Sequence, residues 1–339
     1  MTAVLLITGG ILFVAILALI YRIFTLIGIA RDEDKKRAGL SNKVNAFLFP
    51  LMLVVGFIAI IWYSGIAKEY FLPEASSVHG KEIDSLFWWT MAVIGAAFVI
   101  THILLFIFPF KYQYSEKRTA YFYPHNDKLE LVWTLVPAVV MAGLVISGWF
   151  VWSDITSDAP EDSVAVEIMG KQFNWQVRYG GKDGQIGRYD FRKIDATNSM
   201  GVDFRDPSSL DDFIPREIHV PKGKNVVLKI RSRDVLHSVF MPHFRIKMDA
   251  VPGMQTSFWF TPTKSTAEMR AELGDPEFNY ELACTEICGG GHFAMKMNVV
   301  VDEPADFEKW YAEQEAWAAK NKEYLSTLDL PNLELAGLE

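Results

Sequence analysis

The chain has 339 residues, a formal net charge of −8 and a mean hydropathy of +0.14, and half of its residues are hydrophobic. The acidic balance argues against binding to nucleic acid, whose phosphates attract basic surfaces. The hydropathy is high for a purely soluble protein, and the length allows two or three domains of ordinary size.

Apolar residues are concentrated in the first 153 positions, in four long uncharged runs. The runs cover residues 1–21, 44–67, 85–110 and 131–153. Each run is long enough to cross ~30 Å of hydrocarbon as a helix, which takes about 20 residues. The first run lacks the basic flank and the small-residue cleavage site of a secretory signal. We therefore expect it to be retained, with an atypical cleaved signal as the alternative.

Basic residues are unevenly distributed among the loops between these runs. Four basic residues follow the third run, whereas the loop after the second has only Lys68 and Lys81. The loop after the first run contains Arg22, Arg31, Lys35, Lys36, Arg37 and Lys43. Because loops rich in Lys and Arg stay in the cytoplasm, everything after residue 153 is expected outside. This external part has 31 acidic and 21 basic residues, which would attract a basic soluble partner.

The sequence beyond Asp154 has the alternation of apolar and polar residues that is typical of half-buried strands. Strands are predicted over residues 163–170, 217–221, 225–232, 256–262, 267–273 and 295–302. Short strands separated by turn residues indicate a β-sandwich or barrel. Residues 180–214 are rich in Gly, Asp and Ser and are expected to form an inserted surface loop. The aromatic spacing in residues 306–325 predicts a carboxy-terminal helix, followed by a loose tail.

The predicted fold class is a membrane-anchored α plus all-β protein, with four transmembrane helices before a β-sandwich or barrel. We expect two helices with a basic cytoplasmic loop in residues 1–80 and a helical hairpin in 81–153. An external β-domain follows in 154–305, and the helix and tail occupy 306–339.

The only two cysteines of the sequence lie in one short motif, CTEICGGGHFAM, at residues 284–295. Cys284 and Cys288 are four residues apart, His292 follows four later and Met295 three later, and three glycines permit a tight turn. A disulfide suits an external domain but leaves the His and Met spacing unexplained. Zinc has little use for a thioether, and iron–sulfur clusters usually take four Cys, or two Cys and two His. Thiolate, imidazole and thioether together fit copper better.

Two thiolates can bridge two copper ions, and each metal then needs an imidazole. The second histidine must come from elsewhere in the external domain, which offers His219, His237 and His243. His237 follows a predicted strand, whereas His219 is in mid-strand and His243 follows a proline in a loop. We therefore favour His237 as the additional ligand.

The combination of motifs resembles subunit II of haem–copper cytochrome c oxidases. The likeness covers roughly residues 80–315 and rests on DVLHS (234–238), the cysteine motif, LELVWTLVP (129–137), MGKQFNWQVRY (169–179) and KMDAVPGM (247–254). It implies a cupredoxin-like external domain that carries the binuclear copper centre CuA. It also implies that haems and CuB lie in a partner, subunit I.

The resemblance also implies which residues bind copper. The side-chain ligands would be His237, Cys284, Cys288, His292 and Met295. Glu286 would add its backbone carbonyl, and its side chain would bind a magnesium ion shared with subunit I, with a solvated loop carboxylate as the alternative. In the family pattern His237 and Met295 serve one copper, and His292 and the Glu286 carbonyl serve the other.

Four further positions take roles from the resemblance. Glu130, at the cytoplasmic start of the fourth helix, would lie beside the entrance of a proton path into subunit I, and a solvated cap is the alternative. Phe173 replaces the exposed tryptophan that relays electrons from cytochrome c in the family. Trp175 matches the second tryptophan of this electron-transfer segment and is expected to pack in the core. Asp234 matches an acidic residue near the donor surface.

The function expected from these features is that of subunit II of a bacterial respiratory oxidase. CuA would accept electrons from a cytochrome c-type donor and pass them to haem in subunit I, where O2 is reduced to water while the complex translocates protons. Because Phe173 lacks an indole, electrons would arrive by another route or from a donor that docks differently, such as a membrane-bound cytochrome or an alternative complex III.

The expected partners are oxidase subunits I and III and the lipid bilayer, without nucleic acid. The expected location is the bacterial cytoplasmic (inner) membrane, with the copper domain in the periplasm. The family usually has two membrane helices and this chain has four predicted ones. We expect the additional pair, which comes first in the chain, to pack against a neighbouring subunit. Two alternatives stay open. One is the CuA domain of another reductase, such as a nitrous oxide reductase, and the other is a non-redox subunit, like those of quinol oxidases, with a structural disulfide.

Overall fold

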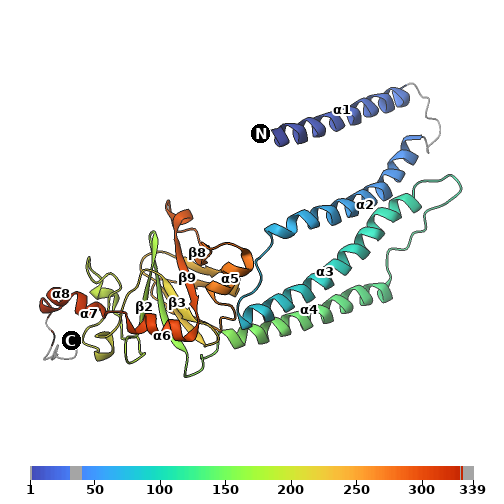
Figure 1. Ribbon diagram of the computed structural model, residues 1–339. Coiled ribbons are helices and arrows are strands. Elements are labelled where there is room, and N and C mark those ends of the chain that lie inside the picture. Colours follow the sequence, from blue (N-terminus) through green and yellow to red (C-terminus); the bar gives the residue numbers. More distant parts are fainter. Residues whose placement is uncertain (1, 31–39, 329, 331–339) are drawn as a thin grey trace. The chain divides into compact units, whose positions relative to one another are not determined.

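The computed structural model describes residues 2–30, 40–328 and 330, and it begins with four long helices (Figure 1). They are α1 (Thr2–Ala30), α2 (Leu40–Ala67), α3 (Val78–Lys111) and α4 (Asp127–Ile155). All four are long and apolar enough to cross a membrane, which confirms the sequence prediction. Of the basic residues used to orient the chain, Arg31 and those at 35–37 lie outside the described residues.

The chain divides into two compact units. One contains residues 1–71 and 91–136, where Phe57 of α2 and Phe98 of α3 meet edge to face with ring centroids 6.1 Å apart. The other contains residues 72–90 and 137–339. The first turns of α3 and the last turns of α4 therefore belong to the same unit as the β-domain.

The β-domain contains two sheets, of order β2-β1-β4-β7 and β3-β9-β8-β5-β6. Strand β1 pairs with β4 in parallel and β3 with β9 in parallel, and the other named strand pairs are antiparallel. The strands are β1 (Val164–Lys171), β2 (Asn174–Tyr179), β3 (Ile218–Pro221), β4 (Val226–Ser232), β5 (His237–Met241), β6 (Ile246–Ala250), β7 (Thr256–Phe260), β8 (Tyr280–Cys284) and β9 (Lys296–Asp302).

Inward-facing residues of both sheets form one hydrophobic core. Val226, Leu228 and Ile230 alternate along β4 and are fully buried, and Tyr280 and Leu282 of β8 belong to the same cluster. Side chains two residues apart share one face of a strand, so this alternation produces a sandwich with a packed interior. The predicted β-sandwich is thereby confirmed.

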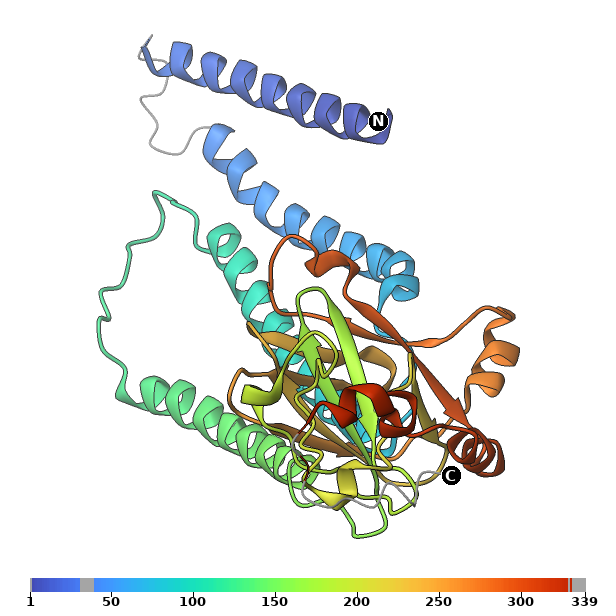
Figure 2. The ribbon, with the colours of Figure 1, turned by 90° about the vertical axis from the view of Figure 1, so that its left-hand side faces the viewer.

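The opposite face of the four-stranded sheet is covered as well. Residues 180–214 lie against it together with the short helices α7 (Trp317–Lys320) and α8 (Lys322–Ser326), which Figures 1 and 2 show beside these loops. A second hydrophobic cluster joins Met169 of β1 to Met200, Phe204 and Leu325. The segment is irregular and partly exposed, as predicted, but its apolar residues are buried, which the sequence did not predict because they have no regular spacing and their burial depends on distant partners.

Charged side chains are buried beneath this layer. Glu167 of β1 accepts hydrogen bonds from Arg178 at 2.5 Å and from Arg231 at 2.6 Å, and Arg178 also pairs with Asp212 at 3.0 Å. Burial raises the pKa of Glu167, but the two guanidinium groups outweigh burial and hold this pKa below its ordinary value. Burial raises the pKa of Asp212 to about 7 although Arg178 opposes the shift. Removing one member of this network would leave a buried charge unpaired.

The predicted strand over residues 267–273 is wrong, because this segment forms helix α5 (Thr266–Leu273). Ser265 and Glu268 form a reciprocal capping box at its start, and Gly274 ends it with φ 65°. The S-x-x-E signal and the following glycine are typical helix boundaries, and here they outweigh the alternation of apolar residues.

The predicted single helix over residues 306–325 is also wrong, because α6 (Pro304–Ala312) ends before α7 and α8 begin. Trp310 of α6 packs on Tyr179 in the main core, whereas Trp317 stacks on Phe204 in the second cluster. The chain bends between these contacts, where the Trp317 N–H donates to the Asp212 carbonyl at 2.8 Å. Residues 331–339 of the expected tail lie outside the described residues.

Candidate metal centre

The loop between β8 and β9 contains most of the candidate ligands. Cys284 is the last residue of β8, and Cys288, His292 and Met295 follow before β9 begins. The Cys284 N–H donates to the Met295 carbonyl at 3.1 Å, which closes the loop on itself. The N–H of residue 285 donates to the Ser238 carbonyl of β5 at 3.2 Å, which fixes the loop against the five-stranded sheet.

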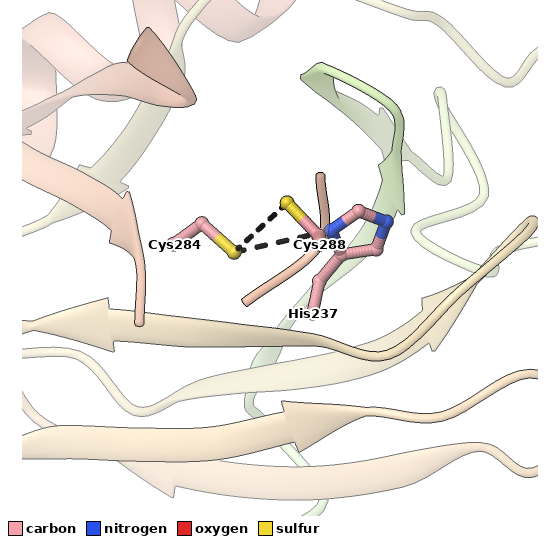
Figure 3. A group of neighbouring side chains, drawn as sticks. All are labelled: His237, Cys284 and Cys288. Atoms are coloured by element: carbon pink, nitrogen blue, oxygen red, sulfur yellow. Dashed lines mark hydrogen bonds between the residues drawn. The ribbon is translucent and has the colours of Figure 1, made fainter. Parts of the chain in front are cut away.

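Two thiol sulfurs and one imidazole meet at this point (Figure 3). The Sγ atoms of Cys284 and Cys288 are 4.0 Å apart, and His237 Nδ1 lies 3.9 Å from Cys284 Sγ. All three side chains are buried. Figure 3 shows that the three side chains point toward one another, although they come from different segments: His237 begins β5, Cys284 ends β8 and Cys288 lies in the loop that follows.

The remaining donor atoms surround the same two sulfurs. His292 Nδ1 lies 3.5 Å from Cys288 Sγ, and Met295 Sδ lies 3.9 Å from it. The Glu286 carbonyl oxygen is 3.3 Å from Cys284 Sγ. Each thiol therefore has its own imidazole, and the structure brings together every ligand atom that the resemblance implies.

His237 is held in one orientation by Asp234. Its Nε2 is 2.9 Å from Asp234 Oδ1, and a carboxylate there favours a proton on Nε2, which leaves the Nδ1 lone pair directed at the sulfurs. Asp234 is itself fixed by the backbone N–H groups of Gln172 at 2.8 Å and Val235 at 2.8 Å. Such a carboxylate partner is the usual support of a metal-binding histidine. The sequence assigned Asp234 only to the donor surface and missed this contact.

The donor set decides which group fits the loop. The two sulfurs are about twice the length of a disulfide bond apart, and both cysteines are free thiols. Two thiols, two imidazoles, a thioether and a carbonyl form a soft donor set of the kind that copper takes. Zinc and iron–sulfur sites use neither a thioether nor a carbonyl as a usual ligand. The residues present therefore fit a pair of copper ions.

Burial, together with neighbouring Cys284, raises the pKa of the Cys288 thiol to about 11. Thiolate is the form that binds metals, so metal binding has to displace a proton from this thiol at neutral pH.

The turn between β1 and β2 lies across the loop. Gln172 Nε2 donates to the Cys288 carbonyl at 2.6 Å, and the Trp175 indole N–H donates to the Met295 carbonyl at 3.4 Å. Phe173 packs directly on Gly289 and Gly291, where an added Cβ would come within 2.9 Å and 2.5 Å of its ring. Trp175 is in the core as expected, at 3% exposure, whereas Phe173 is 41% exposed. Sequence reasoning missed this clamp, because the turn is over 110 residues from the loop.

Other candidate residues lie away from the sulfurs. His219 of β3 contacts Asp302 at 2.6 Å and stacks on Trp310. His243 packs against Tyr280, and burial and a nearby arginine lower its pKa. Glu130 is exposed in the first turn of α4, in the other compact unit.

Two family models match this chain, one over its membrane helices and one over its β-domain. The family model for the transmembrane domain of cytochrome c oxidase subunit II matches residues 65–148, and the model for its periplasmic domain matches residues 164–303. Together they cover more than half of the chain. The chain belongs to the cytochrome c oxidase subunit II family.

Several curated relatives align with most of this chain. An alternative cytochrome c oxidase subunit 2 from Bradyrhizobium diazoefficiens is 35% identical over 70% of this chain and 80% of its own. A cytochrome c oxidase subunit 2 from Thermostichus vulcanus is 28% identical over 73% of this chain and 79% of its own. A crystal structure of the periplasmic domain of subunit II from Bradyrhizobium japonicum is 24% identical and covers 45% of this chain and 93% of its own, with a TM-score of 0.31.

Membership of the cytochrome c oxidase subunit II family confirms the resemblance seen in the sequence. The chain is a membrane-anchored subunit of an oxidoreductase complex, with a periplasmic domain of CuA type. The match to the transmembrane model argues against a nitrous oxide reductase, and the separated thiols argue against a structural disulfide.

Proposed function

We propose that this chain is the electron-accepting subunit of a respiratory haem–copper oxidase. It takes electrons one at a time from a c-type cytochrome and passes them to haem in subunit I, where O2 is reduced to water. The observation that supports this proposal most directly is the pair of buried thiols, each with an imidazole beside it. Two coppers bridged by these thiols would share one unpaired electron, so that bond lengths change little on reduction.

The residues of this chain would hold and shield that centre. His237 and Met295 would serve one copper, His292 and the Glu286 carbonyl the other, with Cys284 and Cys288 between them. His237 and Met295 are at most 1% exposed, so water is excluded from that side. A dry, fixed ligand set keeps reorganisation small and tunes the potential. Of the two imidazoles, that of His292 is the more exposed, because His292 is half-buried whereas His237 is fully buried.

The donor is expected to be basic, because the external part of the chain carries a net charge of −10, from 21 basic and 31 acidic residues. Phe173 lies over the metal loop and is partly exposed, so we propose that the donor docks over it. A soluble or membrane-bound c-type cytochrome would both fit. Turnover of the assembled oxidase with a basic donor should fall as salt rises, and salt-independent turnover would contradict electrostatic steering.

Two carboxylates would act at the boundary with subunit I. The Glu286 side chain is half-buried on the metal loop, and we propose that it binds magnesium shared with subunit I. Substitution by Gln should remove the Mn²⁺ resonance signal of an oxidase grown with manganese. Glu130 would lie beside a proton path, and Glu130→Gln should slow proton uptake by the assembled enzyme. An unchanged Mn²⁺ signal would reject the magnesium role of Glu286, and unchanged proton uptake would reject the role of Glu130.

The whole proposal places the protein in the cytoplasmic membrane of a bacterium, with subunits I and III as partners and proton translocation as a property of the complex. The extra helices α1 and α2 would contact a neighbouring subunit.

One experiment tests the copper assignment. The full chain in detergent, loaded with copper, should bind two copper ions and give a purple colour with hyperfine splitting from two equivalent nuclei. Met295→Leu should perturb this spectrum, whereas Met254→Leu should not, because Met254 is exposed and outside the ligand set. A colourless chain without free thiols would reject the proposal.

A further inference from the structure

A second group of side chains of the types that bind metals lies where the start of α3 and the end of α4 meet the β-domain. His79 is in the first turn of α3 and Asp154 is in the last turn of α4. His79, Glu82 and Asp154 place one donor atom each within 4.8 Å of one another. All three belong to the same compact unit as the β-domain. The function proposed above uses none of them.

His79 is buried and fixed by the β-domain. Its side chain is 3% exposed and meets the Trp259 ring of β7 edge-on, with ring centres 4.3 Å apart. Its Nδ1 lies 3.2 Å from the Trp259 carbonyl oxygen. A carbonyl only accepts hydrogen bonds, so Nδ1 is the atom that carries hydrogen. A backbone carbonyl of this kind is the usual support of a metal-binding histidine.

The other ring nitrogen faces a carboxylate. His79 Nε2 is 3.1 Å from Asp154 Oδ2, and the Asp154 side chain is 59% exposed. With hydrogen on Nδ1, a neutral ring presents a lone pair at Nε2, and an ionised carboxylate also presents only lone pairs. Two acceptors at this distance need a positive charge between them, which is either a proton on Nε2 or a metal ion.

Glu82 distinguishes this site from a simple ion pair. It lies one helical turn after His79, so its carboxylate projects on the same side of α3. No ion pair involves Glu82 among the residues that the structure describes, although Asp84, two positions on, is held by Arg245 at 2.7 Å and 2.9 Å. Two carboxylates around one imidazole carry more negative charge than one proton would balance.

We propose that His79, Glu82 and Asp154 bind one divalent transition-metal ion of the zinc class. Imidazole favours zinc over magnesium or calcium, and two carboxylates with one histidine and a water complete four-coordination. Bonds of about 2.0–2.1 Å in a tetrahedral site place ligand atoms about 3.3 Å apart, close to the His79–Asp154 separation. The bound ion would join the start of α3 to the end of α4, and His79 would connect it to β7 through the Trp259 carbonyl. It would act as a structural link that is independent of the copper centre.

The test uses the full chain in detergent, first freed of metals by a chelator and then loaded with two copper ions per chain. Zinc is then titrated, zinc and copper are both counted, and the zinc X-ray absorption spectrum is recorded. We expect one zinc per chain with nitrogen and oxygen ligands only, and copper content unchanged. Sulfur at about 2.3 Å from zinc would place the ion at the cysteines and overturn the proposal.

Variants at exposed carboxylates keep the fold intact during this test. Glu82→Gln and Asp154→Asn should each weaken zinc binding at least tenfold and abolish the rise in Tm that zinc causes. Asp158→Asn is the matched control, because Asp158 is exposed on the same connection and outside the group. Two results would overturn the proposal: no zinc bound, or equal binding by Asp154→Asn. If the original chain binds no zinc and Asp154→Asn lowers Tm equally with and without zinc, then the contact between His79 and Asp154 is an imidazolium–carboxylate pair.

Discussion

Gly291→Ala should disrupt the clamp on the metal loop. A Cβ at position 291 would come within 2.5 Å of Phe173 Cγ and 2.9 Å of Phe173 Cβ. These atoms are the base of the side chain, so a small rotation of the ring does not relieve the clash. The backbone at Gly291 has φ −94° and ψ 7°, which alanine adopts. The effect of the substitution is therefore steric, and the three atoms nearest to the added Cβ all belong to Phe173.

The size of this effect follows from overpacking. Forcing one methyl group into a filled contact costs about 1–3 kcal/mol of unfolding free energy. For a unit of 150–250 residues, each kcal/mol lowers Tm by about 2–4 °C, so we expect a fall of about 2–12 °C. The assay is thermal unfolding of the copper-free chain in detergent. In the copper-loaded chain, the same variant should lose copper to a chelator faster.

The loop provides its own control. Gly290→Ala adds the same methyl group one residue earlier, where nothing lies within 4 Å, and Tm should stay nearly constant. In a Phe173→Ala background, Gly291→Ala should cost less than about 0.5 kcal/mol, since the clashing ring is gone. Equal falls in Tm for the two glycine variants, or an unrelieved cost without Phe173, would refute the proposed contact.

Three further substitutions test the site and its support. Gln172→Ala removes the hydrogen bond to the Cys288 carbonyl, so it should lower the unfolding free energy by about 1 kcal/mol and speed copper loss. Gln176→Ala is the control and should not change copper loss, because the Gln176 amide donates to Ser199 instead. Phe173→Trp should keep copper bound and raise the rate of electron uptake from a soluble c-type cytochrome, and an unchanged rate would mean that electrons bypass position 173. Asp212 has a folded-state pKa of about 7, above the unfolded value of about 3.9, so its contribution to stability falls as pH rises between these values and then levels off. Unfolding at pH 5 and pH 8 should therefore differ less in Asp212→Asn than in the original chain, and an unchanged difference would count against this assignment.

The features that the sequence predicted correctly are mostly local. Long apolar runs identify a membrane helix without reference to any other segment. The spacing from Cys284 to Met295 brings four donor atoms together within one loop. His237 could be chosen from three histidines only by its place relative to a strand, and the family resemblance then supported it. These predictions needed little information about which distant segments meet.

The features that the sequence did not predict depend on long-range contacts. Glu167, Arg178 and Arg231 alternate with apolar residues on β1, β2 and β4, which is the pattern of a sheet face in water. In the structure they pair with one another beneath the 180–214 layer, so the same alternation describes a buried face. The role of Gln172 was hidden for a similar reason, because nothing near it in the sequence indicates the cysteine loop.

The covered face also bears on the metal loop. Gln172 and Phe173 form the turn between β1 and β2, and Met169 on the outer face of β1 packs in one cluster with the 180–214 layer and with α7 and α8. The pairing of Glu167 with Arg178 joins the same two strands near the end of the hairpin that lies opposite the turn. The helices α7 and α8 therefore stabilise the hairpin whose tip clamps the loop, although the hydrophobic cluster to which they belong includes none of the candidate copper ligands. Copper retention should therefore depend on the layer formed by residues 180–214, α7 and α8. A substitution that loosens this layer, although far from the thiols, should also weaken the contact of Gln172 and Phe173 with the metal loop.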